Sequence, residues 1–343
     1  METQPKSSSH KLLGASLVSL AVLGGLFALP SQIHDLGQPD FPTPREASFL
    51  VVGDIMLGRN VELLSKDNPN YPFEKIRKFL ESYETVVANL EGPIPETHTR
   101  TLSGSFSFSF PPNSAQTLSS NNIEYVSLAN NHGLDQGSSG LLNTQNILSE
   151  VGITAVGHPS AIDQESVKTA RIGNVSISIF AFNQTWETFN LSRAVELIQT
   201  TKDTDYKIVL IHWGDEYQLT SNDTQQQIGR AFIDAGADAI FGAHPHVVQE
   251  IEVYRGKPIF YSLGNFIFDQ YFSRNTQEGL LVQVDMVDEN ITYTLWPLTS
   301  TKSQPVLMEE NSKKEFLNKL AARSDTRVYN DIAEGILVTP LEH

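Results

Sequence analysis

Residues 239–248 read Ala-Ile-Phe-Gly-Ala-His-Pro-His-Val-Val and carry two histidines, His244 and His246, on either side of a proline. The apolar runs before and after this pair predict a strand, a tight loop and a second strand. Pro245 has no N–H and a fixed φ, so it stiffens the loop and holds both imidazoles at one edge. Neutral imidazole is the commonest metal ligand in proteins, although a histidine pair beside a strand is also typical of a polar rim. The neighbouring strands decide between these two interpretations.

The chain around this stretch alternates short apolar runs with amphipathic or capped segments. The apolar runs predict strands, at 49–52, 86–89, 124–129, 153–156, 175–181 and 207–212. The amphipathic or capped segments predict helices, at 73–82, 138–151 and 223–235. From residue 247 only strands are predicted, at 247–253, 258–262, 280–287 and 291–296. The first part is typical of βα units with a largely parallel sheet and the second of antiparallel hairpins, and both can belong to one layered α/β domain.

Two further segments have their own patterns. Residues 105–110 alternate Ser and Phe, which predicts a half-buried edge strand, with an aromatic lip beside the site as the alternative. Residues 311–323 predict a polar terminal helix. We therefore expect the main domain at 47–300 and a helical tail at 301–343.

The segment Leu12–Leu29 is almost purely apolar and follows Lys6 and Lys11. Its length is at the threshold for a membrane span, and no good cleavage site follows it. We therefore expect a signal anchor at 12–30 that places residues 1–11 in the cytoplasm and the domain outside the cell membrane. Cleavage of this segment would instead give a secreted protein. Residues 31–46 contain Gly and three prolines and predict a linker.

The composition excludes several classes of site. The formal net charge is −16, which disfavours nucleic acid as a partner. The same charge repels any polyanionic substrate unless cations lie in the site. The chain has no cysteine, so disulfides and thiolate zinc sites are excluded.

Metal-binding residue types recur at the carboxyl ends of successive predicted strands, where open α/β folds bind their ligands. They are Asp54; Asn89 and Glu91; Asn130, Asn131 and His132; His212 and Glu216; His244 and His246; and, at the last strand, Asn265. One or two such coincidences are expected in polar loops. Five fit a centre of oxygen and nitrogen ligands for Mn, Fe or Zn.

Each residue also has a local interpretation. Asp54 is a possible helix N-cap, and Asn130 and Asn131 are possible turn formers. Asp135 is predicted to brace a turn, and Asn265 to lie in a turn that only borders the pocket.

Six motifs follow one another in the chain, at Val52–Arg59, Ala88–Pro93, Leu128–Asp135, His212–Tyr217, Gly242–His246 and Ser262–Phe266. Together they resemble the CapA family of poly-γ-glutamate capsule biosynthesis proteins, which is similar to the calcineurin-type metallophosphoesterases. The resemblance covers about residues 48–270. It implies an α/β fold, a four-layer α/β/β/α sandwich with a two-metal centre between its sheets.

The resemblance also implies roles for the motif residues. Asp54 and His246 would hold one metal, Glu91 would bridge, and Asn131, His212 and His244 would hold the second metal. His132 would be the general acid, and Glu216 an added ligand or base. The candidates for substrate binding are Arg59, Asn89, Asn130 and Asn265.

One position departs from the phosphoesterase pattern, because Met56 stands where those enzymes carry a histidine ligand, and a thioether is a poor ligand for a hard ion. The resemblance implies a membrane-anchored protein of capsule synthesis that hydrolyses or transfers γ-glutamyl amide bonds. Its partners would be the anionic polymer and membrane synthase subunits. Met56 favours the alternative of a non-catalytic polymer-binding or export scaffold, whereas His132 favours an enzyme. A metal-dependent phosphoesterase is the third possibility.

Overall fold

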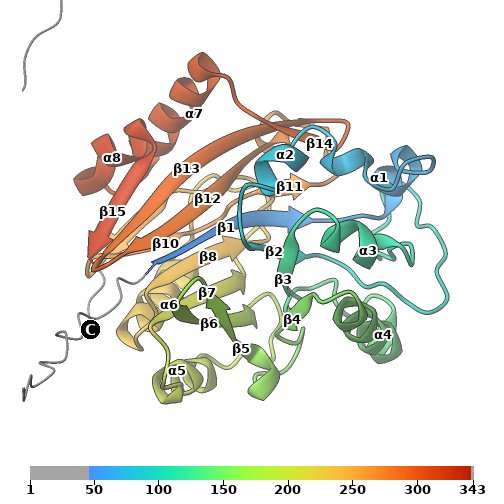
Figure 1. Ribbon diagram of the computed structural model, residues 1–343, viewed down its shortest axis with the longest axis horizontal. Helices are drawn as coiled ribbons and strands as arrows, with labels where there is room; N and C mark the ends of the chain where they lie inside the picture. The colour runs from blue at the N-terminus through green and yellow to red at the C-terminus, as the bar shows by residue number, and fades with distance from the viewer. Residues whose placement is uncertain (1–45, 341–343) are drawn as a thin grey trace, which may run out of the picture. The chain divides into compact units, whose positions relative to one another are not determined.

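Residues 46–340, the part of the chain described by the computed structural model, form two β-sheets that face each other (Figure 1). The n-region and anchor predicted at 1–30, and nearly all of the linker, lie outside the described residues. Among residues 46–340, no helix is both long and apolar enough to cross a membrane.

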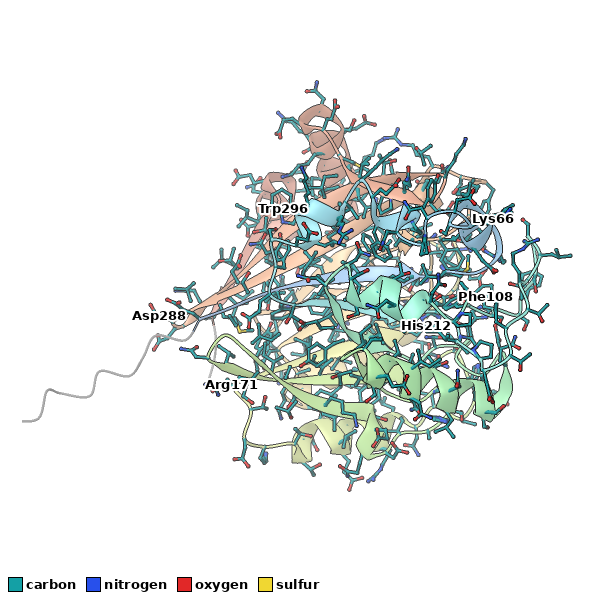
Figure 2. The ribbon with its side chains drawn as sticks, turned by 45° about the vertical axis from the view of Figure 1, so that its right-hand side comes forward. Lys66, Phe108, Arg171, His212, Asp288 and Trp296 are labelled. Carbon is teal, nitrogen blue, oxygen red and sulfur yellow. The ribbon has the colours of Figure 1, made fainter. Side chains whose placement is uncertain are left out.

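The larger sheet has the order β14-β13-β12-β1-β2-β3-β4, with β11 beside β1 and β15 beside β13. Its parallel strands are β1 (Glu46–Ile55), β2 (Val86–Leu90), β3 (Ile123–Ser127), β4 (Thr154–Val156) and β11 (Asn265–Ile267). Its antiparallel strands are β12 (Glu278–Val287), β13 (Asn290–Thr301), β14 (Gln304–Leu307) and β15 (Ile336–Pro340). Asp288, in the turn between β12 and β13, lies at the end of the molecule remote from His212 (Figure 2).

The smaller sheet has the order β5-β6-β7-β8-β10-β9. Its four inner strands run parallel, and they are β6 (Val175–Asn183), β7 (Tyr206–His212), β8 (Ala239–Ala243) and β10 (Lys257–Phe260). The edge strands β5 (Val167–Ile172) and β9 (Ile251–Tyr254) pair antiparallel to their neighbours.

The alternation of side chains along β1 explains the layers, because successive residues of a strand point to opposite faces. Phe49 and Val51 belong to the apolar cluster between the two sheets, whereas Leu50 and Val52 belong to the cluster under the outer helices. Both faces of β1 are therefore buried, which is why this strand reads as an uninterrupted apolar run.

Helices cover the outer face of each sheet (Figure 1). The larger sheet is covered by α1 (Arg59–Leu64), α2 (Arg77–Leu80), α3 (Ser114–Ser119) and α4 (Gly137–Glu150). The smaller sheet is covered by α5 (Leu191–Thr200) and α6 (Asp223–Asp234). Two more helices, α7 (Glu310–Arg323) and α8 (Tyr329–Glu334), pack against the central cluster beside β13.

The predicted mixed α/β fold, with parallel strands first and antiparallel hairpins later, is confirmed. Three segments differ. Residues 105–110 form a loop rather than an edge strand, residues 244–250 form a loop before β9, and only residues 77–80 of the predicted helix at 73–82 are α-helical. The predicted helical tail at 301–343 also needs correction, because β14 and β15 pair with β13 and so belong to the larger sheet.

Candidate metal centre

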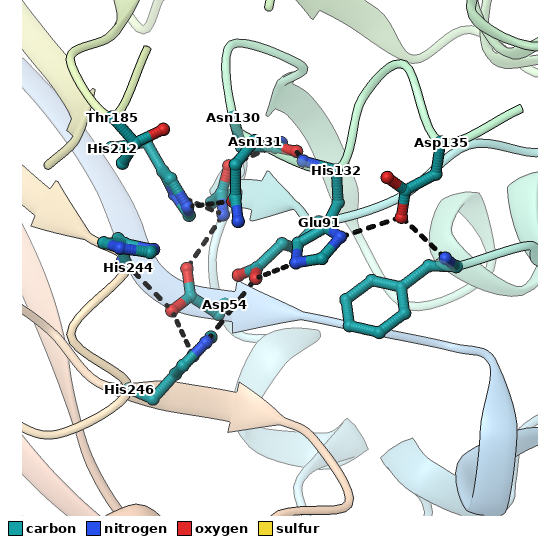
Figure 3. Close-up of polar contacts among 12 residues, drawn as sticks. Asp54, Glu91, Asn130, Asn131, His132, Asp135, Thr185, His212, His244 and His246 are labelled. Carbon is teal, nitrogen blue, oxygen red and sulfur yellow. Dashed lines mark hydrogen bonds and ion pairs between the residues drawn. The ribbon is translucent and has the colours of Figure 1, made fainter. Parts of the chain in front are cut away.

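The carboxyl ends of strands from both sheets meet at one place, and the predicted polar residues converge there (Figure 3). Asp54 lies near the end of β1, Glu91 directly follows β2, His212 ends β7, and His244 directly follows β8. Each of these four side chains is buried. The convergence predicted from the sequence is therefore present in the structure.

Asp54 is fully buried and connects the two sheets. Its Oδ1 accepts a hydrogen bond from Nδ2 of Asn89 at 2.8 Å. Its Oδ2 lies 3.3 Å from Nδ1 of His246 and accepts a longer bond, 3.4 Å, from the backbone N–H of His244.

Glu91 is fully buried, and neither of its carboxylate oxygens accepts a hydrogen bond from any residue of the described chain. Its Oε1 lies 3.6 Å from Nε2 of His246 and 3.8 Å from Nε2 of His132. A buried carboxylate without donors carries a desolvation penalty of several kcal/mol unless a cation compensates it. Glu91 therefore has the environment of a ligand to a positive ion.

Two of the buried histidines are held in the neutral form. Burial, reinforced by the neighbouring imidazoles, lowers the pKa of His212 well below its usual range. Burial and the nearby His246 lower the pKa of His244 to about 4. The two rings lie 4.7 Å apart between centroids, and Nδ1 of His244 has no hydrogen-bond partner among residues 46–340. Neutral imidazole is the form that binds metals.

The third histidine shows where this centre attracts positive charge. Burial by itself lowers the pKa of His246, but Glu91 and Asp54 outweigh burial and raise that pKa to about 9. Burial has the opposite effect on an acid: it raises the pKa of Glu91 well above its usual range, while His246 opposes this shift. The two buried carboxyl groups therefore favour a cation between the sheets.

The ligand atoms form two sets, and within each set they lie within 4.8 Å of one another. One set is Asp54, Glu91 and His212, and the other is Glu216, His244 and His246. Together with the unpartnered oxygens of Glu91, these oxygen and nitrogen donors fit a divalent metal ion. The grouping differs from the pairing that the resemblance implied, in which Asp54 and His246 share a metal.

Asn131 and Asn130 have different surroundings, although they are neighbours in the chain. The Oδ1 of Asn131 lies 2.7 Å from Nε2 of His212, beside the candidate ligands. Asn130 is fully buried, and its Nδ2 donates to Oδ1 of Asn89 and to the backbone oxygen of Leu90. The Oδ1 of Asn130 also accepts a hydrogen bond from the backbone N–H of His132 at 3.1 Å. Asn130 thus fixes the loop that carries His132.

A cavity of about 270 Å³ opens onto the centre. Its lining includes His132, Glu216, His246 and the aromatic residues Phe106, Phe108, Tyr217, Phe268 and Phe272. Phe106, which is 89% exposed, and Phe108 line the cavity, so the loop at 105–110 forms part of the aromatic lip that was the alternative to an edge strand, whereas Phe110 is buried in the apolar cluster. Of the four residues predicted to bind substrate, Arg59 lines this cavity, whereas Asn89, Asn130 and Asn265 lie buried outside its lining.

Arg59 is held firmly at the cavity. Its guanidinium forms an ion pair with Asp269, and its Nη1 donates to the backbone oxygen of Ser105 at 3.0 Å. The guanidinium carbon also lies 4.8 Å from the ring centroid of Phe108. Asp269 belongs to none of the six motifs, so its sequence context did not indicate this role.

His132 is positioned by residues that were not predicted to act with it (Figure 3). Its Nδ1 lies 2.8 Å from Oδ2 of Asp135, and its ring stacks on Phe108 with 3.9 Å between centroids. The same oxygen of Asp135 accepts the backbone N–H of Phe108 at 2.6 Å. Asp135 was predicted only to brace a turn. Its position three residues after His132 is the sequence signal from which the contact with that imidazole could have been predicted.

The prediction that Met56 is no metal ligand agrees with its position. Met56 is fully buried in the apolar cluster under α1, and its Sδ lies 3.1 Å from the backbone nitrogen of Gly58, so its thioether supplies no ligand to the centre. His98 lies outside the centre, and its ring nitrogens lie 3.0 Å from Oε1 of Glu62 and 2.8 Å from Oγ of Ser109.

The chain was compared with family models, with curated proteins and with solved structures. The model of the family described as bacterial capsule synthesis protein PGA_cap matches residues 48–270. The PGA biosynthesis protein CapA of Bacillus subtilis is 28% identical over 87% of this chain and 82% of its own length. The capsule biosynthesis protein CapA of Bacillus anthracis is 30% identical over 84% of this chain and 73% of its own length. Among solved structures, the NAD nucleotidase of Haemophilus influenzae matches with a TM-score of 0.45 and 12% identity, over 82% of this chain and 64% of that one.

Proposed function

The chain belongs to the bacterial capsule synthesis family PGA_cap, and we propose that it acts in poly-γ-glutamate synthesis as a metal-dependent hydrolase or transferase of γ-glutamyl amide bonds. The observation that carries this proposal is the buried, unpartnered carboxylate of Glu91 with the imidazole of His132 beside it. The order helices, sheet, sheet, helices supports the metallophosphatase-like sandwich that the family resemblance implies.

The candidate ligands are Asp54, Glu91, Asn131, His212, His244 and His246, with Glu216 as an exposed addition. Bound there, divalent ions such as Mn, Fe or Zn polarise a carbonyl oxygen and lower the pKa of a water molecule. They also supply the positive charge that a chain of net charge −16 needs to accept an anionic polymer.

His132 has the geometry of a general acid. A carboxylate only accepts hydrogen bonds, so Asp135 holds the Nδ1–H and leaves Nε2 directed toward Glu91. In hydrolysis, the oxygen of water bonds to the carbonyl carbon, the amide C–N bond breaks, and Nε2 of protonated His132 gives its proton to the leaving nitrogen; the proton that the water loses then restores His132. In transfer, an amine takes the place of water.

Arg59 supplies a fixed positive charge at the cavity. Its ion pair with Asp269 and its position beside Phe108 hold the guanidinium in place before any ligand arrives. We propose that Arg59 binds a carboxylate of the polymer next to the bond that is cleaved, since guanidinium and carboxylate match in shape and charge.

Met56 is the observation that favours a second candidate, a polymer-binding or export scaffold without catalysis. Because its side chain packs in the apolar cluster, the centre has one ligand fewer than the phosphoesterase pattern provides. The paired His132 and Asp135 favour the enzyme instead, since a scaffold has no use for an oriented proton donor. Phosphoester hydrolysis is the third candidate, and the same ligand loss counts against it.

We also propose that the domain works outside the cytoplasmic membrane, because the apolar segment Leu12–Leu29 precedes it. Protease added to intact cells should degrade the domain, and protection in intact cells would contradict this.

The activity itself is tested with purified protein, added Mn, and γ-linked glutamate oligomers whose lengths are followed by mass spectrometry. Shorter or rearranged oligomers, absent with His132→Ala, are the expected result. Unchanged oligomers, together with cleavage of a phosphoester, would overturn the amide proposal, and unchanged oligomers that nevertheless bind would favour the scaffold.

A further inference from the structure

A second cavity, of about 400 Å³, lies beside α1, whose residues Glu62 and Leu63 belong to its lining. It is lined by Leu57, Leu63, Lys66, Arg100 and Asn113, among others. Its lining shares no residue with that of the metal-centre cavity, and the proposed mechanism assigns it no role.

The same two chain segments contribute to both cavities. In the segment 59–66, Arg59 lines the metal-centre cavity and Lys66 lines the second one. In the segment 100–108, Arg100 lines the second cavity, whereas Ser103 and Phe108 line the first. Lys66 and Phe108 are also seen on the same side of the molecule in Figure 2. The two cavities are therefore bordered by the same two segments, 59–66 and 100–108, which we call the wall.

The wall is braced by His98. Its two ring nitrogens lie 3.0 Å from Oε1 of Glu62, on α1, and 2.8 Å from Oγ of Ser109, at the end of the loop. Both neighbours are largely or fully buried, so the brace is fixed within the fold. His98 therefore ties α1 to the loop at 105–110.

The charge of the second cavity fits an anion. Lys66 and Arg100 are exposed, and neither forms a hydrogen bond or ion pair with another residue in the described range. Glu62 is the acidic residue of the lining: its Oε1 contacts His98, its Oε2 is buried without a hydrogen-bond partner among residues 46–340, and the two cations outnumber this one carboxylate. In a chain of net charge −16, two free cations beside a cavity give a local attraction for carboxylates.

The apolar part of the lining fits the rest of such a ligand. Leu57, Leu63, Pro69 and Pro111 line the same cavity as the two cations. A chain of γ-linked glutamate alternates carboxylates with methylene groups, so it offers both charge and apolar surface to this lining. A small inorganic anion would use the cations alone.

We propose that the second cavity binds carboxylates of the same anionic polymer that is presented to the metal centre, with the polymer crossing the wall formed by residues 59–66 and 100–108. This inference rests on the proposed function, because it takes its ligand from there. In this proposal, Lys66 and Arg100 bind the carboxylates of long polymer chains, and the reaction takes place at the metal centre.

The test compares the full-length protein with two double variants that change the charge equally. K66E/R100E reverses the cations of the second cavity, and R171E/K202E reverses two exposed cations elsewhere, with Arg171 lying far from Lys66 in Figure 2. Binding of a labelled γ-linked glutamate decamer is measured by fluorescence anisotropy with Mn present. Turnover of a γ-glutamyl dipeptide, which contains a single γ-glutamyl amide bond, is measured alongside.

K66E/R100E should weaken decamer binding by about tenfold, because two favourable charge contacts become repulsive, while R171E/K202E changes it far less. Dipeptide turnover should be equal in all three proteins. Equal decamer binding by the two double variants would overturn the second site and leave the proposed function standing. Absence of decamer binding by the unmodified protein would overturn both, and loss of dipeptide turnover in K66E/R100E alone would show that these cations serve the first cavity.

Discussion

The Nδ1 atom of His132 lies 2.8 Å from Oδ2 of Asp135, and this contact fixes which ring nitrogen faces the metal centre. Asp135 also accepts the backbone N–H of Phe108, whose ring stacks on the imidazole. One carboxylate thus holds both the proton donor and the aromatic surface against it.

Asp135→Ala should lower kcat on γ-glutamyl oligomers by about tenfold or more, because the imidazole loses the partner that orients it. The KM and the bound metal should change little, since Asp135 belongs to neither ligand set. Steady-state kinetics with elemental analysis of the same samples check this. Asp135→Asn, which keeps an acceptor oxygen, should be less impaired, and full kcat in Asp135→Ala would show that the contact is only structural.

His132→Ala should separate catalysis from metal binding. We expect kcat to fall by ~10²–10⁴-fold, the usual contribution of a general acid, while the metal content stays that of the unmodified protein. His244→Ala is the matched comparison, because His244 is a candidate ligand and its loss should reduce both. Loss of metal from His132→Ala would place His132 among the ligands instead.

Met56→His tests whether the departure at this position matters for metal binding. The side chain of Met56 packs in the apolar cluster, so an imidazole placed there should lower Tm and add no metal. Met56→Leu is the control and should cost less than about 1.5 kcal/mol, as volume-conserving replacements usually do. A gain of bound metal in Met56→His, measured by elemental analysis, would mean that this position does reach the centre.

The hydroxyls of Tyr206 and Tyr293 hydrogen-bond to each other, fully buried between the two sheets. Tyr293→Phe should destabilise the fold by about 1–3 kcal/mol, because the hydroxyl of Tyr206 is left without its partner. The double variant Y206F/Y293F should recover part of that loss. Denaturant unfolding at neutral pH measures both, and a double variant less stable than Tyr293→Phe would contradict the argument.

The same pair gives a pH dependence. Burial raises the pKa of both tyrosines above the value of about 10 that they have in the unfolded chain. Their contribution to stability is therefore fully present below about pH 10 and is lost as the pH rises through the folded-state values. The double variant should lose less stability above pH 10 than the unmodified protein, and equal losses would exclude this pair as the cause.

The sequence predicted the centre well because the carboxyl ends of parallel strands meet at one edge. Asp54, Glu91, His212 and His244 could be placed together from strand positions alone, and the structure brings their side chains into one buried group. The division into parallel and antiparallel strands followed from the same apolar runs.

The two wrong strand predictions, at residues 105–110 and from residue 247, have physical causes that the periodicity of a sequence does not reveal. The Ser and Phe alternation at 105–110 imitates a strand, but the loop is held by contacts to side chains such as Arg59 and Asp135. The strand expected from residue 247 begins only at Ile251, because His244 and His246 have positive φ angles of 97° and 57° and bend the backbone. Such strained backbone is typical of functional sites.

The central claim is tested most directly by the divalent metal bound per chain, measured by elemental analysis after supply of Mn or Zn and removal of free ions. The unmodified protein should hold about two ions, as in two-metal hydrolases. Glu91→Gln keeps the size of the side chain but removes its charge, and it should lose most of that metal. Absence of bound metal from the unmodified protein, or full retention by Glu91→Gln, would contradict a metal centre built around this buried carboxylate.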